Sequence, residues 1–524
     1  MHEGWSRGQR AAIVAVAALG GTVLWLVGDK TAENLALILL SVGTAAAVAW
    51  LSASRPGVAF GILFLVATLS RWTISTHLGD MRLEQPAIVA GFAALLLAPS
   101  RLDLGRLRAL WPIGASLGLY LGCLALSSVL FAPDRADSLR MTFWTGLSMA
   151  GGLLAFLLLA RSNARATEWM LASGYLQAAV ALVFAVLFFT LGPVVVAGPE
   201  PAPGIIQPLS SLPKVFGLSW EANLYASLLA ALAIIGLNRL LSGGRPADKV
   251  LVPFMVAAIA LGVTRGAYLG LAAGVAVYAM FAVAPGRLPA PRDIRRIGKR
   301  LVPVAGSLLA GMAVAAVLLQ GGRPPNTPLT FTFPGWGGGP VAVASGSPGP
   351  TAGPTARPTA RPTPSPTPSP TPKATPFVVL PQNDTVAFRA ERIPVALADI
   401  PNSLVIGLGA NSFGQRHGDP SQHGAPDHIA PMALAALYES GVLGAAGLGL
   451  GFGLILLMLF RSSRRRVDRG TIAAYAGALA SLLVAYEATS ALNFALIWLI
   501  AGAGLAASTQ PADPAEGIGA PLPA

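Results

Sequence analysis

Charge is scarce in this 524-residue chain. Asp, Glu, Lys and Arg make up 11% of it, whereas soluble domains carry roughly 25%. The shortage excludes an ordinary soluble domain, and the hydrophobic residues, 54% of the total, come in long blocks rather than in amphipathic stripes. A stretch of about 18 or more apolar residues is typical of a transmembrane helix. We therefore expect an all-α polytopic membrane protein.

Cysteine and acidic residues are scarce as well. The single cysteine, Cys123, lies in an apolar block, so the sequence predicts neither a disulfide framework nor a cysteine-based metal site. We interpret Cys123 as a small buried hydrophobe. Basic residues outnumber acidic ones, which gives a net charge of +13. They occur in short clusters between apolar blocks, a pattern that indicates membrane topology and disfavours nucleic acid as a partner.

The apolar blocks predict about fourteen membrane spans, within a range of about 12 to 14. We place them at 11–28, 34–53, 56–71, 86–99, 109–131, 141–160, 168–192, 222–241, 249–264, 266–285, 301–320, 436–460, 470–489 and 491–508. The first block lacks a small-residue cleavage site, so we expect a retained helix rather than a signal peptide. Residues 1–320 then hold helices one to eleven, and 431–508 hold the last three.

The distribution of Lys and Arg predicts the orientation. With the N-terminus inside, 22 of the 36 Lys and Arg residues fall in inner segments. Half of the others lie in one long loop, which the positive-inside rule largely ignores. We therefore expect a multi-pass protein of the cytoplasmic membrane with both termini in the cytoplasm.

The long loop, 321–430, is expected to be extracytoplasmic. Its middle, at about 339–376, is a Pro/Thr/Ser tract that includes TARPTARPTPSPTPSPTP. Proline removes amide donors and fixes φ, so this tract should form an extended, disordered spacer. It is either an insertion without specific function or a site of O-glycosylation. The tail at 509–524 is rich in Pro, Ala and Gly and is also expected to be disordered.

Ionisable residues at the edge of a membrane are costly unless they face water or a partner, so they are candidates for function. Arg265, in GVTRGAYLG, is a single charge between two apolar blocks. It could bind phosphate oxygens or simply extend to lipid headgroups. Glu221 and Asn223, in GLSWEANLYA, stand at the start of a helix, where Glu221 could equally be a cap that complements the helix dipole. Lys214 lies in the Pro/Gly-rich outer segment, 193–221, before them.

A third cluster spans the end of the long loop and the next helix. It contains Arg389, Arg392, Arg416, His417, His423, His428 and Glu439. The loose Gly/Pro setting disfavours zinc, which leaves solvated loop histidines or a positioned general base as readings. Pro431 favours a helix that begins near residue 430, which would place His428 just before the helix and Glu439 near the membrane surface.

The order of these clusters resembles the O-antigen ligase and O-antigen polymerase superfamily. Members have an Arg-Gly pair at a helix start, then a long outer loop that ends in Gly-x-Gly-x-x-x-Phe, a His, and Glu-x-Gly-x-x-Gly. The counterparts here are Arg265-Gly266, the segment 407–413 (GLGANSF) and the segment 439–444 (ESGVLG), while Trp220-Glu221-Ala222-Asn223 is similar to a further family stretch. The resemblance covers roughly 200–460. The family His usually lies nine residues before the Glu, a position that here is Ala430, two residues after His428.

The resemblance implies metal-independent glycan transfer, without a cofactor, from a polyprenyl-diphosphate donor to a glycan or lipid acceptor at the outer face of the cytoplasmic membrane. It implies Arg265 as a catalytic residue with Arg389 or Arg392 on the diphosphate, and His428 as general base. Glu439 or Glu221 would orient groups, and Asn223 and Lys214 complete the substrate-binding set. A polymerase of the same superfamily is the nearest alternative. A transporter or lipid flippase, or a non-catalytic envelope protein, are alternatives from other classes.

Overall fold

The computed structural model describes residues 28, 31–70, 72–76, 80–97, 104–160, 165–191, 194–196, 206–209, 212–215, 218–219, 222–262, 264–282, 299, 302–313, 329–331, 385–418, 429–465, 469–489 and 491–510. Almost all of the first expected span, the whole Pro/Thr tract and the C-terminal tail after Gln510 lie outside these ranges.

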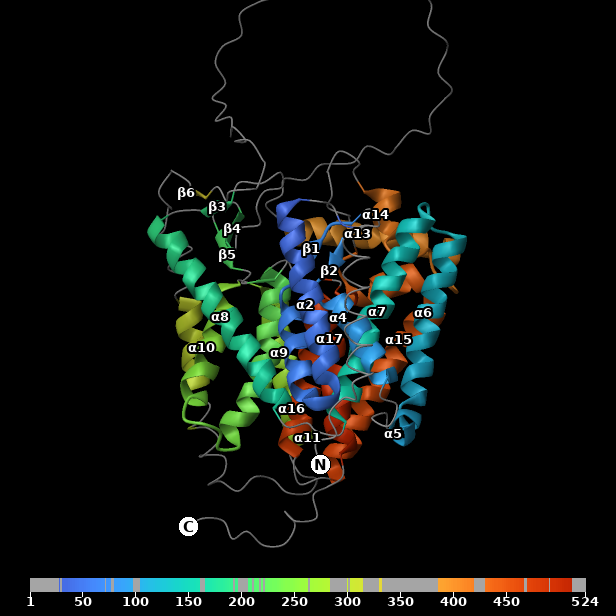
Figure 1. The fold of residues 1–524 in the computed structure, drawn as a ribbon. Coiled ribbons are helices and arrows are strands. Elements are labelled where there is room, and N and C mark those ends of the chain that lie inside the picture. The colour runs from blue at the N-terminus through green and yellow to red at the C-terminus, as the bar shows by residue number, and fades with distance from the viewer. Residues whose placement is uncertain are drawn as a thin grey trace, which may run out of the picture.

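The described part of the chain is mostly helical (Figure 1). The helices are α2 (Ala32–Ser54), α3 (Pro56–Thr68), α4 (Glu84–Leu97), α5 (Leu104–Ala109), α6 (Trp111–Leu130), α7 (Arg135–Leu159), α8 (Ala166–Leu191), α9 (Ala222–Leu241), α10 (Asp248–Leu261), α11 (Arg265–Ala282), α13 (Thr385–Asp399), α14 (Ser412–His417), α15 (Met432–Arg465), α16 (Arg469–Tyr486) and α17 (Ala495–Thr509), with a 3-10 turn η2 (Ile400–Ser403) and a further helix at Val302–Ala313. Each expected span from 34–53 onward coincides with one of them.

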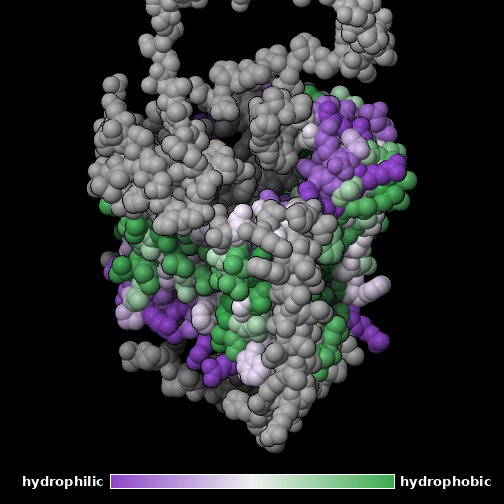
Figure 2. Space-filling view, turned by 45° about the horizontal axis from the view of Figure 1, so that its top comes forward, coloured by the Kyte–Doolittle hydropathy of each residue, from purple (hydrophilic) through white to green (hydrophobic). Residues whose placement is uncertain are grey.

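Six of the described helices are long and apolar enough to cross a membrane, namely α2, α6, α7, α9, α11 and α15. The prediction of an α-helical membrane protein is supported to that extent, and the count of fourteen crossings stays a prediction. Large apolar side chains point outward around the middle of the bundle, as a lipid-facing surface requires. Leu269, for example, is 65% exposed, and Figure 2 shows a hydrophobic band between two more polar ends.

Short strands occur in the connections, which the expectation of an all-α chain did not include. β1 (Thr73–Ile74) pairs antiparallel with β2 (Met81–Arg82), and β4 (Ile206–Leu209) pairs antiparallel with β5 (Leu212–Val215). β3 (Val194–Val196) pairs in parallel with β6 (Leu329–Phe331), far along the sequence. These runs are too short to show the period-2 alternation by which strands are recognised in a sequence.

Small residues set the packing of the central helices. α9, α16 and α17 are buried on nearly every side. Gly270 and Gly274 of α11 face α16 so closely that a Cβ atom would stand 2.5 Å from the Ser481 carbonyl oxygen and 2.6 Å from that of Gly477. Such small-xxx-small spacing lets two backbones approach in a membrane without a hydrophobic driving force between them.

The bundle has two ends, which we name by their residues. The loop end carries the β1–β2 hairpin, the segment from η2 to α14, and the starts of α9, α11 and α15 (Figure 1). The basic end carries α5 and the connections between α7 and α8, α9 and α10, and α15 and α16. Two ion pairs tie the basic end together, Arg239 with Asp248 at 3.2 Å and Arg245 with Glu168 at 2.5 Å.

Candidate functional site at the loop end

Helix α15 is broken near its start, and the break holds the segment 404–411. Gly441 has φ 66° and ψ −174°, a conformation that is essentially restricted to glycine. A Cβ atom on Gly441 would collide with the Val405 carbonyl group, and one on Gly407 would collide with that of Glu439. Two glycines therefore allow the loop backbone to cross the helix backbone in direct contact.

Backbone hydrogen bonds close this crossing on both sides. The N–H groups of Leu408 and Gly409 donate to the carbonyl oxygens of Tyr438 (2.8 Å) and Glu439 (3.0 Å). In return, the N–H groups of Val442 and Leu443 donate to Leu404 (2.8 Å) and Val405 (3.1 Å). The two segments that carry the resemblance, 407–413 and 439–444, thus form one interlocked unit. Their relation could not be read from the sequence, which separates them by about 30 residues.

The Glu439 carboxylate turns back onto the same loop. Its Oε1 accepts a hydrogen bond from the Asn411 N–H at 3.0 Å. Asn411 has φ 55°, a left-handed conformation that asparagine tolerates better than most residues. The Asn411 and Gln415 side-chain amides both donate to Oδ2 of Asp137, at 2.9 and 3.0 Å. Glu439, predicted to act in catalysis, therefore anchors a polar network that joins α7, α14 and α15.

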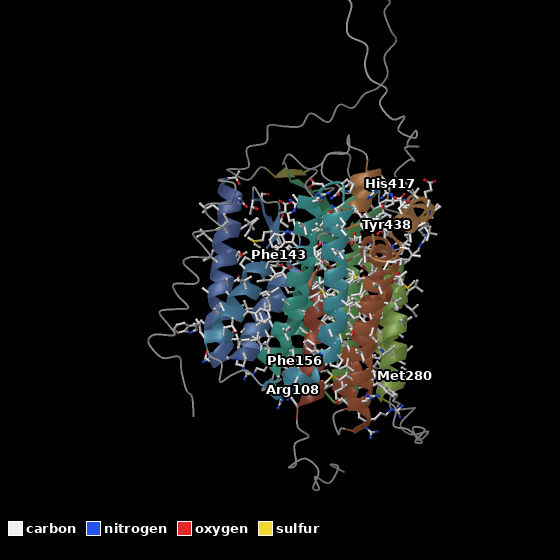
Figure 3. The ribbon with its side chains drawn as sticks, turned by 90° about the vertical axis from the view of Figure 1, so that its right-hand side faces the viewer. Arg108, Phe143, Phe156, Met280, His417 and Tyr438 are labelled. Carbon is white, nitrogen blue, oxygen red and sulfur yellow. The ribbon has the colours of Figure 1, made fainter. Side chains whose placement is uncertain are left out.

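A histidine, a carboxylate and a phenol meet beside this network. Asp399 Oδ2 lies 2.6 Å from His417 Nε2 and accepts a hydrogen bond from the Tyr438 hydroxyl at 2.8 Å. The Phe413 ring packs on His417 and Tyr438, with centroids 5.0 and 5.5 Å away. Figure 3 shows His417 and Tyr438 together at the loop end, far from Arg108 and Met280 at the basic end. The sequence singled out His417 but not Asp399, because nothing in the spacing pairs them.

Charge stabilises the ionised form of Asp399. Partial burial alone would raise the pKa of its carboxyl group. The hydrogen bonds from His417 and Tyr438, together with the electrostatic attraction of the same imidazole and of the Arg416 guanidinium, outweigh burial and lower the pKa below its ordinary value. Asp399 is thus an anion that fixes the imidazole of His417. Nδ1 of His417 makes no hydrogen bond to the residues that the structure describes.

The other two predicted clusters adjoin each other. Arg265 is the first residue of α11, and its side chain is exposed. The buried Thr264 hydroxyl lies 3.4 Å from the Ala222 carbonyl oxygen, which brings the start of α9, with Asn223, next to the start of α11. A Cβ atom on Gly266 would touch Ala488 at 2.7 Å. The α16–α17 connection therefore lies against the start of α11. We call the adjoining starts of α9 and α11 the Arg265 corner.

The same connection carries polar contacts that the sequence reasoning missed. The Glu487 carboxylate accepts the Ala433 N–H at 3.2 Å, at the start of α15. Arg82 Nη1 donates to the Asn493 carbonyl oxygen at 2.5 Å, and its guanidinium stands 3.6 Å from the centroid of the Phe494 ring. For Glu487 a signal was available, since it is an isolated ionisable residue near the end of the expected span 470–489. Arg82 lies in a connection with Asp80 and Glu84 close by, so the residues around it carried no such signal.

The predicted residues have different outcomes. Arg265, Asn223, Arg392 and Glu439 lie at the loop end. Arg389 belongs to α13 and Lys214 to β5, but their side chains lie outside the described part, as do Glu221 and His428 entirely. The roles that the resemblance implies for Arg265 and His428 therefore stay predictions. Within the described residues, no group of three His, Cys, Asp or Glu side chains could hold a metal ion.

The comparisons with known proteins add no further constraint. No protein-family model matches the chain, and no curated protein matches it.

Proposed function

We propose that this chain transfers a glycan from a polyprenyl-diphosphate donor to an acceptor hydroxyl at the loop end. The observation that carries the proposal is the meeting of three distant segments. The Arg265 corner, the loop segment 404–411 and the start of α15 all lie at one end of the bundle, and residues 485–488 contact both the first and the last of them. Polar chemistry and an apolar helix wall, which a lipid-linked donor requires, are thus next to each other.

The arginines supply the electrostatic part of the reaction. In the transfer, the acceptor oxygen forms a bond to the anomeric carbon, the bond from that carbon to the phosphate oxygen breaks, and the diphosphate leaves as an anion. Arg265, with five N–H donors in a planar fork, suits those phosphate oxygens, and Arg392 or Arg389 would share the charge. Fixed cations near a developing anion stabilise the transition state without a metal ion.

Two histidines are candidates for the general base that takes the acceptor proton. The family pattern favours His428. The geometry favours His417, because a carboxylate bonded to Nε2 fixes the tautomer and leaves Nδ1 to accept a proton. Glu439 then orients the loop rather than the substrate, since its carboxylate is bonded to the Asn411 N–H.

The proposal includes an orientation. The basic end faces the cytoplasm with both termini, as the positive-inside rule requires, and the loop 321–430 is extracytoplasmic. All fourteen expected spans are then crossings of the cytoplasmic membrane. Ligase and polymerase differ only in the acceptor, and the polymerase remains the alternative within the class.

The broken helix favours a transferase over a transporter. Transporters use the free carbonyl groups of broken helices to coordinate ions. Here the carbonyl oxygens of Tyr438 and Glu439 are bonded to loop amides, and the Ser127 hydroxyl also donates to Glu439, at 2.8 Å. The break serves to hold the loop.

Membranes from cells that express the chain, supplied with polyprenyl-diphosphate-linked glycan, would test the proposal. Arg265→Ala should abolish transfer, as should His428→Ala or His417→Ala, whichever histidine is the base. Lys249→Gln, which removes an exposed charge at the opposite end, is the matched control and should keep full activity. Full transfer by Arg265→Ala would refute the diphosphate assignment, and full transfer by the double histidine variant would refute base catalysis.

A further inference from the structure

A groove opens at the basic end, away from the candidate site. It lies between α6, α15 and the end of α17 and has a volume of about 440 Å³, which is within the range of small-molecule sites, roughly 300–1,000 Å³. Ile113 of α6 and Leu454 and Leu457 of α15 form its apolar walls. Arg461, Ser462 and Ser508 form its polar end.

Helix packing explains why a groove exists here. α6 and α15 pack closely at Gly447 and Gly451, where added Cβ atoms would stand 2.7 Å from the Ser116 carbonyl oxygen and 2.5 Å from the Leu117 side chain. One turn further towards the basic end, Leu454 and then Leu457 replace glycine. The larger side chains line a gap between the helices, and the groove is a product of the small-to-large change along α15.

The polar end of the groove lies where lipid headgroups would be. Arg461 is exposed and forms no ion pair with the described residues. Ser462 Oγ donates to the Ser508 carbonyl oxygen at 2.9 Å, which closes the floor between α15 and α17. Trp111 is 73% exposed at the first turn of α6, next to Pro112, which lines the groove. Tryptophan and arginine in one layer are typical of the membrane–water interface.

We propose that this groove binds an anionic phospholipid, with one acyl chain along Ile113, Leu454 and Leu457 and the phosphate on Arg461. Charge complementarity selects this occupant, because a guanidinium that has no ion-pair partner among the described residues, at the end of an apolar groove, matches a phosphate at the end of an alkyl chain. Basic pockets between helices on the cytoplasmic side are suited to anionic headgroups. The site is independent of the proposed transfer reaction.

Native mass spectrometry of the full chain in detergent, titrated with phosphatidylglycerol or phosphatidylcholine, would test this. The first phosphatidylglycerol should bind about fivefold tighter than phosphatidylcholine, the effect expected of one basic residue near an anionic headgroup. Arg461→Gln should remove that preference. Lys249→Gln, at the same end but not in the groove lining, should keep it. Ala109→Trp, which fills the groove, should weaken both lipids, while circular dichroism shows unchanged helix content.

Several results would overturn the proposal. An equal affinity for the two lipids in the wild type would remove the role of Arg461. An equal loss in Lys249→Gln and Arg461→Gln would assign the preference to the general field of the basic end. Displacement of the lipid by millimolar inorganic phosphate would show a phosphate site without an acyl chain. Dimers that disappear in Ala109→Trp would make the groove an interface between copies of this chain.

Discussion

At the scale of single residues, Asp399 connects three helices at the loop end. It ends α13, and its carboxylate binds His417 of α14 and Tyr438 of α15. One anion therefore fastens the loop helices to a helix long and apolar enough to cross a membrane. The apolar residues around it, among them Ile400 and Phe413, are buried in a cluster of their own, so the loop segment docks as a small packed unit rather than as a loose connection.

This fastening should be lost in acid. The pKa of Asp399 is lowered in the fold, so its contribution is complete above the ordinary carboxyl pKa, about 4, and disappears as pH falls through the folded value. A spin label at Ala390→Cys, on the exposed side of α13 and in a Cys123→Ser background, should be immobile at pH 7 and become mobile as the pH falls through the folded pKa of Asp399, which lies below the ordinary carboxyl value. Asp399→Asn should give a mobile label at pH 7. An immobile label at every pH in the wild type would contradict the assignment.

At the scale of elements, the break in α15 leaves backbone N–H and C=O groups without partners in the helix, and the loop segment 404–409 supplies new partners. Unpaired backbone groups in a membrane are costly. The four hydrogen bonds between 404–409 and 438–443 replace those that the break removes, and the glycines at 407 and 441 permit the contact. The break and the loop are therefore a single structural feature, and neither should persist without the other.

Gly441→Ala should destabilise the protein by about 3 kcal/mol or more. The cost combines a backbone conformation that alanine rarely adopts with a clash against residue 405. Gly449→Ala is the control from the same helix, because a Cβ atom there meets nothing within 4 Å, and it should be neutral or slightly stabilising. Thermal unfolding in detergent would measure both. Equal midpoints for the two variants would mean that the break is not needed.

At the scale of the whole molecule, the arrangement is a buried centre with apolar and polar zones around it. α9, α16 and α17 fill the interior, exposed leucines and valines form the outer band, and ionisable residues collect at the two ends (Figures 2 and 3). This order is the inverse of a soluble protein's surface, where a wide apolar band would cause aggregation. It places the loop end and the groove beside Arg461 at opposite ends of the bundle.

Single-cysteine labelling in intact cells would test that orientation. In a Cys123→Ser background, Ala398→Cys at the loop end should react with a membrane-impermeant maleimide, and Ser242→Cys at the basic end should react only after the cells are broken. Both positions are exposed in the fold, so burial does not limit the reaction of either cysteine with the maleimide. The reverse pattern would place the loop end in the cytoplasm and would exclude an extracytoplasmic transferase.

The sequence by itself determined the long helices. Its apolar blocks located them, and the bounds 222–241 agree with α9 to the residue, because the length and composition of a membrane helix are local properties. It also placed Arg265 between two helices, directly before the second, and the structure has it as the first residue of α11. Only the tertiary structure decided that 404–411 crosses α15 at Gly441, that Asp399 pairs with His417, and that Arg82 reaches Asn493. These contacts join residues up to 411 positions apart, and they depend on how helices pack, which no local pattern of residues encodes.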